Sequence, residues 1–125
     1  MTRRNISSGG PYEAPYGYSR AVRIGNLVEV AGTCAQPPNV DGCDAGTQAR
    51  DALRIIVEAL AEAGASVSDL IRTRIYVTDL ADTEAVLTAH GDVFGDVRPA
   101  ATLVQVAGLI DPALKVEIEA TAVLS

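Results

Sequence analysis

The sequence of 125 residues has few of the residue types from which many functional sites are built. Trp is absent, and there are one His, one Met, one Phe and two Cys. Two cysteines and a single distant histidine, His90, match no zinc-binding spacing, so we predict no metal site. Cys34 and Cys43 could form one disulfide, but we expect two free thiols in a reducing cytoplasm.

Long apolar runs and an excess of basic residues are also missing. No stretch reaches the roughly 18 apolar residues that a membrane span requires. The N-terminal segment MTRRNISSGGPYE has basic residues but no apolar stretch behind them, so it is not a signal peptide. The net charge is −6, whereas nucleic-acid binding needs basic groups that displace counterions, and Arg3-Arg4 is too short to reverse the sign. We therefore expect a cytoplasmic protein with neither a membrane nor a nucleic-acid partner.

What the sequence does contain is aliphatic material for a core. With 48% hydrophobic and 21% charged residues, the chain can bury a core of Ala, Val, Leu and Ile and is not disordered by composition. Its length suits one compact domain. Residues 1–17 are rich in Gly, Pro, Ser and Tyr and lack periodicity. We expect an N-terminal arm there, followed by a single domain over residues 18–125.

The first elements of this domain follow from the spacing of apolar residues. They alternate with polar residues on both sides of Gly25-Asn26, which predicts a hairpin whose turn residues tolerate positive φ. The segment TCAQPPNVDGCDAG reads as a loop. A helix is expected from about Gly46 to Ala63, with Asp44 and Thr47 as candidate caps and Gly64 as the stop. The apolar face of this helix would consist of Ala49, Ala52, Leu53, Ile56, Leu60 and Ala63.

The second half of the chain predicts three strands and one more helix. In DLIRTRIYVTDL, alternation places Ile71, Ile75 and Val77 on one face of a strand and Arg72, Arg74 and Tyr76 on the other. A helix from Asp82 to about Phe94 ends before Pro99. Strands near Ala101–Ala107 and Lys115–Val123 close the chain. The second helix would bury Val86, His90, Val93 and Phe94.

The resulting order, β-β-α-β-α-β-β, predicts an α+β fold in which two helices cover one face of a sheet. The other face would be polar, because the last strand alternates between two kinds of residue. Solvent is one environment for that face, and other copies of the chain are another; the residues alone slightly favour solvent. The face would carry Glu29, Arg72, Arg74, Gln105, Lys115, Glu117, Glu119 and Thr121.

The two glutamates of the last strand are candidates for acid-base chemistry. Glu117 and Glu119 are two residues apart on a strand, so their carboxylates share one face. Neighbouring carboxylates can shift one another's pKa and act as acid and base. Strand alternation alone, however, also produces such pairs on solvated faces, and that explanation is the commoner one.

Three other residues have a functional and a structural explanation each. A lone His on a buried helix face is more often a packed, hydrogen-bonded residue than a base, so we expect His90 to be structural. Cys34 follows a predicted strand, and it could be either an exposed thiol or a small buried hydrophobic residue. Arg98, before Pro99, could clamp a carboxylate bidentately, but a solvated charge at a loop end is favoured.

Five segments cover the chain from about Tyr18 to Val123 in a characteristic order: GYSRAVRIGNLVEVAGT, TQARDALRIIVEALAEAGAS, IRTRIYVTDL, RPAATLVQVAGL and VEIEATAV. Their order and spacing together resemble the RidA/YjgF family of enamine/imine deaminases. The resemblance implies a chorismate-mutase-like single domain, a homotrimer and ligand clefts between subunits. It also implies hydrolysis of reactive enamines or imines to 2-keto acids and ammonia, without a cofactor.

The resemblance also assigns roles to individual positions. Glu119 matches the residue that positions water or transfers protons, and Tyr18 matches an active-site tyrosine. Gly32 and Thr33 match the backbone-lined wall of the pocket. Ala101 stands where the family has an arginine that binds the substrate carboxylate, and Thr102 and Leu103 belong to the same pocket segment.

The alanine at position 101 leaves two functions open. A methyl group cannot form charge-assisted hydrogen bonds, each worth about 1.5–3 kcal/mol. We therefore predict a small-molecule enzyme that processes a reactive imine or enamine but is not an efficient 2-aminoacrylate deaminase. The alternative is a non-catalytic trimer that binds or senses a metabolite. RNA cleavage, suggested by the family's older label, is disfavoured by the acidic net charge.

Overall fold

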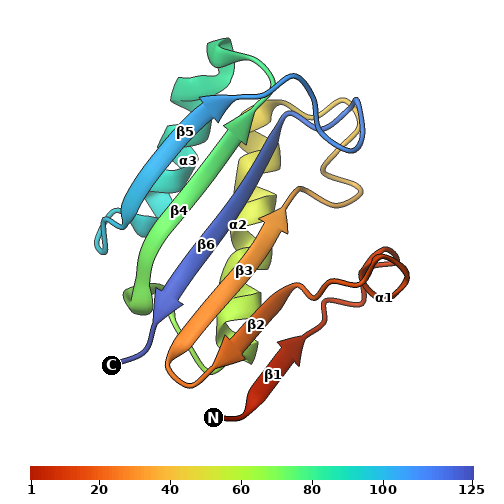
Figure 1. Cartoon of the computed structure of the whole chain (residues 1–125). Helices are drawn as coiled ribbons and strands as arrows, with labels where there is room; N and C mark the ends of the chain where they lie inside the picture. Colours follow the sequence, from red (N-terminus) through yellow and green to blue (C-terminus); the bar gives the residue numbers. More distant parts are fainter.

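One six-stranded sheet organises the computed structural model, which describes all 125 residues. Its strand order is β1-β2-β3-β6-β4-β5, and every neighbouring pair is antiparallel except β4 and β5, which run parallel (Figure 1). The elements are β1 (Arg3–Ile6), α1 (Glu13–Tyr16), β2 (Ala21–Ile24), β3 (Leu27–Thr33), α2 (Ala45–Glu62), β4 (Leu70–Val77), α3 (Thr83–Phe94), β5 (Ala100–Gln105) and β6 (Val116–Val123), with 3-10 turns at Val67–Asp69 and Leu80–Asp82.

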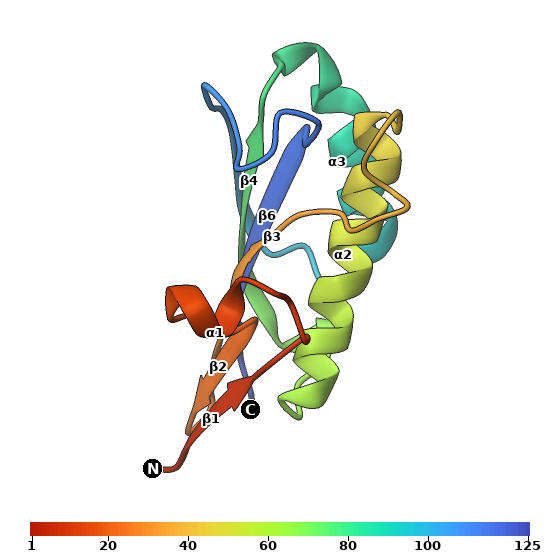
Figure 2. The same cartoon turned by 90° about the vertical axis from the view of Figure 1, so that its right-hand side faces the viewer.

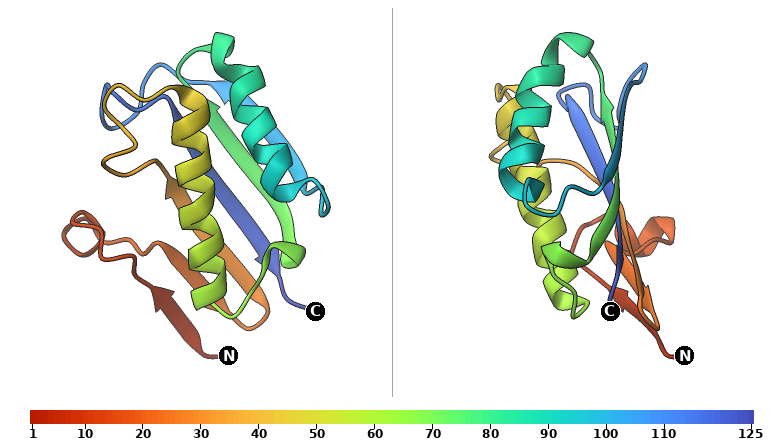
Figure 3. Two further views of the ribbon diagram at one scale, coloured as in Figure 1. Left: turned by 180° about the vertical axis from the view of Figure 1, so that it is seen from behind. Right: turned by 90° about the vertical axis from the view of Figure 1, so that its left-hand side faces the viewer.

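The two long helices cover one face of the sheet, as the sequence predicts. Figure 2 shows α2 and α3 on one side of the strands, and the left view of Figure 3 shows them lying across the sheet from behind. The short α1 lies on the opposite side. Because the helices shield only one face, the apolar side chains of every central strand turn toward them. The largest fully buried side chains include Phe94, Leu53, Ile56, Leu60, Ile75 and Ile118.

Helix α2 forms where the sequence places it. The Asp44 side chain accepts a hydrogen bond from the backbone N–H of Thr47 at 2.8 Å, which satisfies one of the free donors at the helix start. Gly64, just past the helix end, has a φ of 83°, a conformation that glycine adopts without steric cost. Gln48 on this helix is fully buried and bonds Val40, Ala113 and Lys115, so it ties the two long loops together.

The hairpin of β2 and β3 is also confirmed, whereas β1 was not foreseen. Gly25 has a φ of 58° at the hairpin turn, and Asn26 does not share this positive φ. The segment expected to be an arm contributes β1, which pairs antiparallel with β2 at the sheet edge and brings the strands to six. Of its four residues only Ile6 is buried, so the strand gives no alternating apolar pattern that sequence reasoning can detect.

The predicted orientation of Ile71 is wrong, and a bulge is the reason. Ile71 is 51% exposed, whereas Leu70 is buried. Leu70 pairs with Ala122 and Arg72 pairs with Thr121, so β4 has one residue more than β6 at this point. Such an extra residue reverses the alternation locally. Beyond the bulge the expected faces return, with Ile75 and Val77 in the core.

None of the helices combines the length and the apolar composition that crossing a membrane requires.

Candidate functional site

The sheet face away from the long helices carries most of the predicted polar residues. The prediction is wrong for Gln105, which pairs with the buried Val77 and therefore lies on the helix side of β5. On β6, Val116, Ile118, Ala120 and Ala122 are buried, while the residues between them are half-buried on the other face. There Glu119 lies 3.5 Å from Arg74 of β4, and Thr121 donates a hydrogen bond to Glu29 of β3. The alternation predicted for the last strand is therefore confirmed, and it places both glutamate carboxylates on this face.

A cavity lies on this face beneath the N-terminal segment. Its volume is about 510 Å³, and it is bounded by β1, α1, the start of β2, and the central strands. Two of the predicted site residues line it, Tyr18 from the segment before β2 and Glu119 from β6. Arg74 and Glu29 also line it, so the cavity wall carries charges of both signs.

The segment around α1 forms the outer wall of the cavity, and Glu13 fixes the turn that precedes this helix. The buried Glu13 carboxylate accepts hydrogen bonds from the backbone N–H groups of Ser8 and Gly10. Burial by itself would raise the pKa of Glu13, but hydrogen bonds from Ser8, Ser7 and Gly10 outweigh it and lower the pKa. Tyr18 then bonds the Glu13 carbonyl through its backbone N–H at 2.9 Å. The position of Tyr18 thus depends on this turn.

A second bulge, in β3, shapes the site next to β6. Val30 pairs with Ala120 and Thr33 pairs with Ile118, so Ala31 and Gly32 together oppose Glu119. A bulge of this kind redirects the strand locally. Thr33 is buried as a result, whereas the space that a side chain at Gly32 would fill is occupied by the Glu117 carboxyl group.

Glu117 lies flat against the glycine of this bulge. A Cβ at Gly32 would be 2.9 Å from the Glu117 carboxyl carbon, so only glycine leaves room for the carboxylate in this position. The Cys34 thiol donates a hydrogen bond to Glu117 Oε1 at 3.4 Å. Burial, and then the negative charge of Glu117, raise the pKa of Cys34 to about 12. The thiol is therefore protonated at neutral pH and is not a ready nucleophile.

Arg20 connects the parts of this site, and sequence reasoning did not identify it. Its Nη1 donates to the Gly32 carbonyl at 2.7 Å and to Thr33 Oγ1 at 2.8 Å. Its guanidinium carbon lies 5.7 Å from the centre of the Tyr18 ring, within the range of a cation–π contact. Tyr18, Gly32 and Thr33, predicted separately as substrate contacts, thus meet at one cation. The only sequence signal for Arg20 is its place two residues after Tyr18.

The three predicted residues of β5 fall on two faces. Ala101 pairs with Thr73 and Leu103 with Ile75, both of which are buried on the helix side. Thr102 pairs with Arg74 and accepts a hydrogen bond from Arg72 at 2.7 Å, which places it on the open face. Within one chain, Ala101 and Leu103 therefore do not share the face of Glu119.

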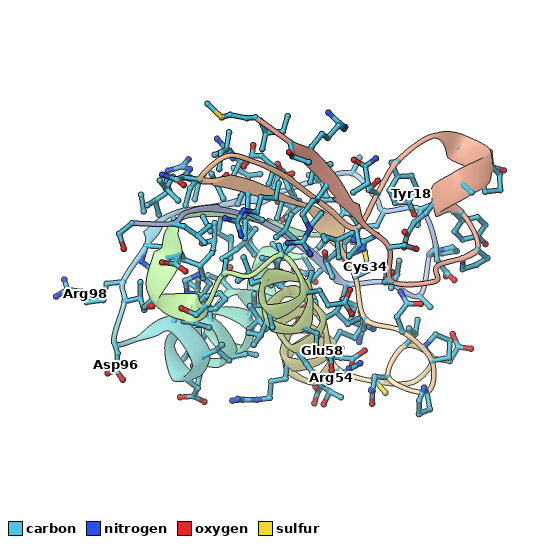
Figure 4. The ribbon with its side chains drawn as sticks, turned by 90° about the horizontal axis from the view of Figure 1, so that it is seen from below. Tyr18, Cys34, Arg54, Glu58, Asp96 and Arg98 are labelled. Carbon is cyan, nitrogen blue, oxygen red and sulfur yellow. The ribbon has the colours of Figure 1, made fainter.

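His90 and Arg98 take no part in this arrangement. The His90 ring bonds Thr73 Oγ1 through Nε2 at 2.8 Å and meets the Phe94 ring edge-on. Burial lowers the pKa of His90, as expected for a packed residue on the helix side. Arg98 is exposed at the loop before β5, and in Figure 4 it extends from the end of the molecule opposite Tyr18 and Cys34.

The chemistry available here is that of carboxylates, a phenol and a guanidinium. Tyr76 of β4 lies beside them; burial first, and then the Glu119 charge, raise the pKa of its hydroxyl. No three His, Cys, Asp or Glu side chains are grouped so that they could hold a metal ion. Both cysteines are free.

Comparison with known proteins gives a consistent set of relatives. A family model described as endoribonuclease L-PSP matches residues 11–124. A solved member of the YjgF/YER057c/UK114 family from Mycobacterium tuberculosis is 50% identical, covers 98% of this chain and 100% of its own, and superposes with a TM-score of 0.92. The 3-aminoacrylate deaminase RutC of Acinetobacter baylyi is 34% identical over 84% of this chain and 85% of its own. The 2-iminobutanoate/2-iminopropanoate deaminase of Escherichia coli is 33% identical over 85% and 86%.

Proposed function

Because this chain belongs to the endoribonuclease L-PSP family, which includes the YjgF/RidA proteins and has the chorismate-mutase-like fold, we propose that it is a small-molecule enzyme that hydrolyses a reactive imine or enamine. The observation that carries the proposal is that Glu119 and Tyr18 line one cavity of about 510 Å³. The relatives named as deaminases support the same chemistry.

The reaction requires a group that moves protons between water and nitrogen. In the proposed mechanism the Glu119 carboxylate takes a proton from water as the water oxygen bonds to the imine carbon. Glu119 passes this proton to the nitrogen, which gives a carbinolamine. The proton of the carbinolamine hydroxyl then moves through Glu119 to the same nitrogen, the C–N bond breaks, and ammonia leaves as the carbonyl forms. An enamine first accepts a proton on carbon to become the imine. Tyr18 would orient the substrate, and Arg74, 3.5 Å from Glu119, would hold the carboxylate in place.

The site is proposed to be completed by other copies of the chain in a homotrimer. Ala101 and Leu103 of β5 lie on the opposite face of the sheet from Glu119 of β6. One chain alone therefore does not bring the predicted site residues together. Light scattering at micromolar concentration should give about three times the 13.0 kDa mass of one chain. A monomer would contradict the inter-subunit site.

Ala101 restricts the substrate in this proposal. Without a guanidinium at that position, we expect slow ammonia release from 2-aminoacrylate generated in situ, compared with a relative that has arginine there. Ala101→Arg should raise this rate if the other pocket residues are suitable. Rapid release by the unmodified protein would contradict this role of Ala101.

Two variants test the proposed acid-base group. A panel of 2-imino acids of increasing side-chain length, made in situ by an amino-acid oxidase, supplies substrates, and ammonia release is followed. Loss of proton transfer should lower kcat by about 10²–10⁴ in Glu119→Gln, whereas Glu58→Gln, on the exposed side of α2, should keep the unmodified rate. A loss confined to Glu117→Gln would move the role to the other carboxylate. No acceleration of any imine would contradict the enzymatic proposal.

A metabolite-binding trimer without catalysis is the second candidate, and the alanine at position 101 is the observation that favours it. In that case a 2-oxo acid should bind while no imine is hydrolysed faster than in buffer. RNA cleavage, which the name of the family model suggests, is not part of the proposal because the chain carries a net charge of −6.

A further inference from the structure

Arg20 is held in a fixed position on the open face of the sheet. It directly precedes β2, and its carbonyl accepts a hydrogen bond from the Ala31 N–H. The two bonds from its Nη1, to Gly32 and Thr33, attach the guanidinium to the bulge of β3. The Tyr18 ring packs against the same group. A guanidinium restrained in this way loses little further freedom when it binds an anion.

One edge of this guanidinium has no partner in the chain. A guanidinium has five N–H donors, and both hydrogen bonds of Arg20 come from Nη1. Its Nε and Nη2 groups, which form the neighbouring edge, make no hydrogen bond within the chain. No carboxylate lies within 4.0 Å, since the ion pairs involve Arg50, Arg54 and Arg74 instead. Two parallel N–H groups on one edge match the two oxygens of a carboxylate.

Three other arginines of this face also have partners within the chain. Arg74 is paired with Glu119, Arg72 donates to Thr102, and Arg3 donates to Asn5. Arg72 and Arg3 make one hydrogen bond each and keep free N–H groups, but neither forms a hydrogen bond or cation–π contact with the residues that hold Arg20. Arg20 combines a free edge with contacts to Tyr18, Gly32 and Thr33.

We propose that the free Nε–Nη2 edge of Arg20 binds the carboxylate of the substrate, in place of a cation at position 101. The inference rests on the proposed function and narrows its substrate class to imines or enamines that carry a carboxylate. The substrate would extend from Arg20 along the Tyr18 ring into the cavity that Tyr18 and Glu119 line, with its anionic end near β2 and not at β5. The absence of a cation at position 101 then changes the binding orientation and the preferred substrate length.

A purely structural role for Arg20, as a brace of the β3 bulge, makes a different prediction. A brace would affect stability, because the bonds to Gly32 and Thr33 would be lost, but it would not distinguish a carboxylate from its ester. Discrimination between charged and uncharged ligands of the same shape is therefore the decisive measurement.

The experiment compares binding of 2-oxobutanoate and 2-oxo-4-methylpentanoate with that of their methyl esters, by calorimetry or NMR titration. The unmodified protein should prefer the acids, and Arg20→Gln should weaken their binding about 10-fold to 100-fold while leaving the esters unchanged. Arg20→Lys keeps the positive charge but loses the two parallel N–H donors, so it should retain part of the preference for acids over esters. Arg50→Gln removes one positive charge from the exposed side of α2, where Arg50 pairs only with Asp92, and serves as the matched control.

The outcomes separate this inference from the proposed function. If imines are hydrolysed but Arg20→Gln keeps the full preference for acids, the anchor is wrong and the enzyme proposal stands. If acids bind through Arg20 but no imine is hydrolysed, the anchor stands and the enzyme proposal fails. A lower melting temperature of Arg20→Gln with unchanged acid-to-ester discrimination would assign Arg20 to bracing alone and overturn the inference. An equal loss in Arg50→Gln would also overturn it.

Discussion

Replacing Gly32 by alanine tests how closely the Glu117 carboxyl group lies against β3. The new Cβ would lie 2.9 Å from the Glu117 carboxyl carbon and 3.0 and 3.3 Å from its two oxygens. Contacts this short cannot persist, so the carboxyl group has to rotate away from the bulge and from the Cys34 thiol. The φ of Gly32 is not positive, so alanine adds no backbone strain of its own.

Two effects of opposite sign determine the change in stability. Alanine reduces the entropy of the unfolded chain, which stabilises the fold by about 0.4–1 kcal/mol. An unfavourable Glu117 rotamer costs about 0.5–1.5 kcal/mol. The single variant should therefore change the free energy of unfolding by less than about 1 kcal/mol. In a Glu117→Ala background there is no carboxyl group to displace, so Gly32→Ala should stabilise by about 0.4–1 kcal/mol.

The assay is a double-mutant cycle in urea followed by circular dichroism. The two substitutions should be coupled by about 1 kcal/mol, as residues in contact are. Gly91→Ala in α3 is the matched control, because a Cβ there meets nothing within 4 Å; its effect should be the same with and without Glu117. Equal effects of Gly32→Ala in both backgrounds would refute the contact between the carboxyl group and the bulge.

Two further predictions concern ionisable groups. In a Cys43→Ser variant, Cys34 should react slowly with iodoacetamide at pH 8, because its pKa is raised to about 12 by burial and then by Glu117; Glu117→Gln should accelerate the reaction, and an unchanged rate would contradict the contact. Burial lowers the pKa of His90, so the unfolded chain takes up this proton at higher pH than the folded one does. The free energy of unfolding should therefore fall as pH drops below about 6.5, and urea titrations at pH 7.5 and 5.5 should show a smaller fall for His90→Gln.

The central part of the fold could be predicted because its signals are local. The apolar spacing of α2, its cap at Asp44 and the glycine after its end each identify the helix independently. The alternation of β6 predicts which side chains are buried, because a strand with one covered face must place its apolar residues there. The pair Gly25-Asn26 between two alternating apolar segments is typical of a tight hairpin turn, so it identifies the hairpin of β2 and β3 locally.

The features that were missed depend on pairing between distant segments. Strand β1 has one buried residue among four, so only its hydrogen bonds to β2 define it. The exposure of Ile71 results from an extra residue in β4 relative to β6. A count of apolar residues along a single strand cannot show that its partner is one residue shorter.

The same limit applies to the site, where bulges and register decide which side chains meet. The resemblance placed Glu119 and Ala101 in one pocket, but pairing places them on opposite faces of the sheet within one chain. In β3, the extra residue at Ala31 and Gly32 places the glycine against Glu117. It also exposes the Gly32 carbonyl, which accepts a hydrogen bond from Arg20. Arg20 therefore becomes significant only once the bulge is known, because its fixed position and its free edge both follow from those bonds. A chain that lacks a cation at position 101 can still recognise an anion through a residue beside a different strand, and substitution at Arg20 decides whether this chain does so.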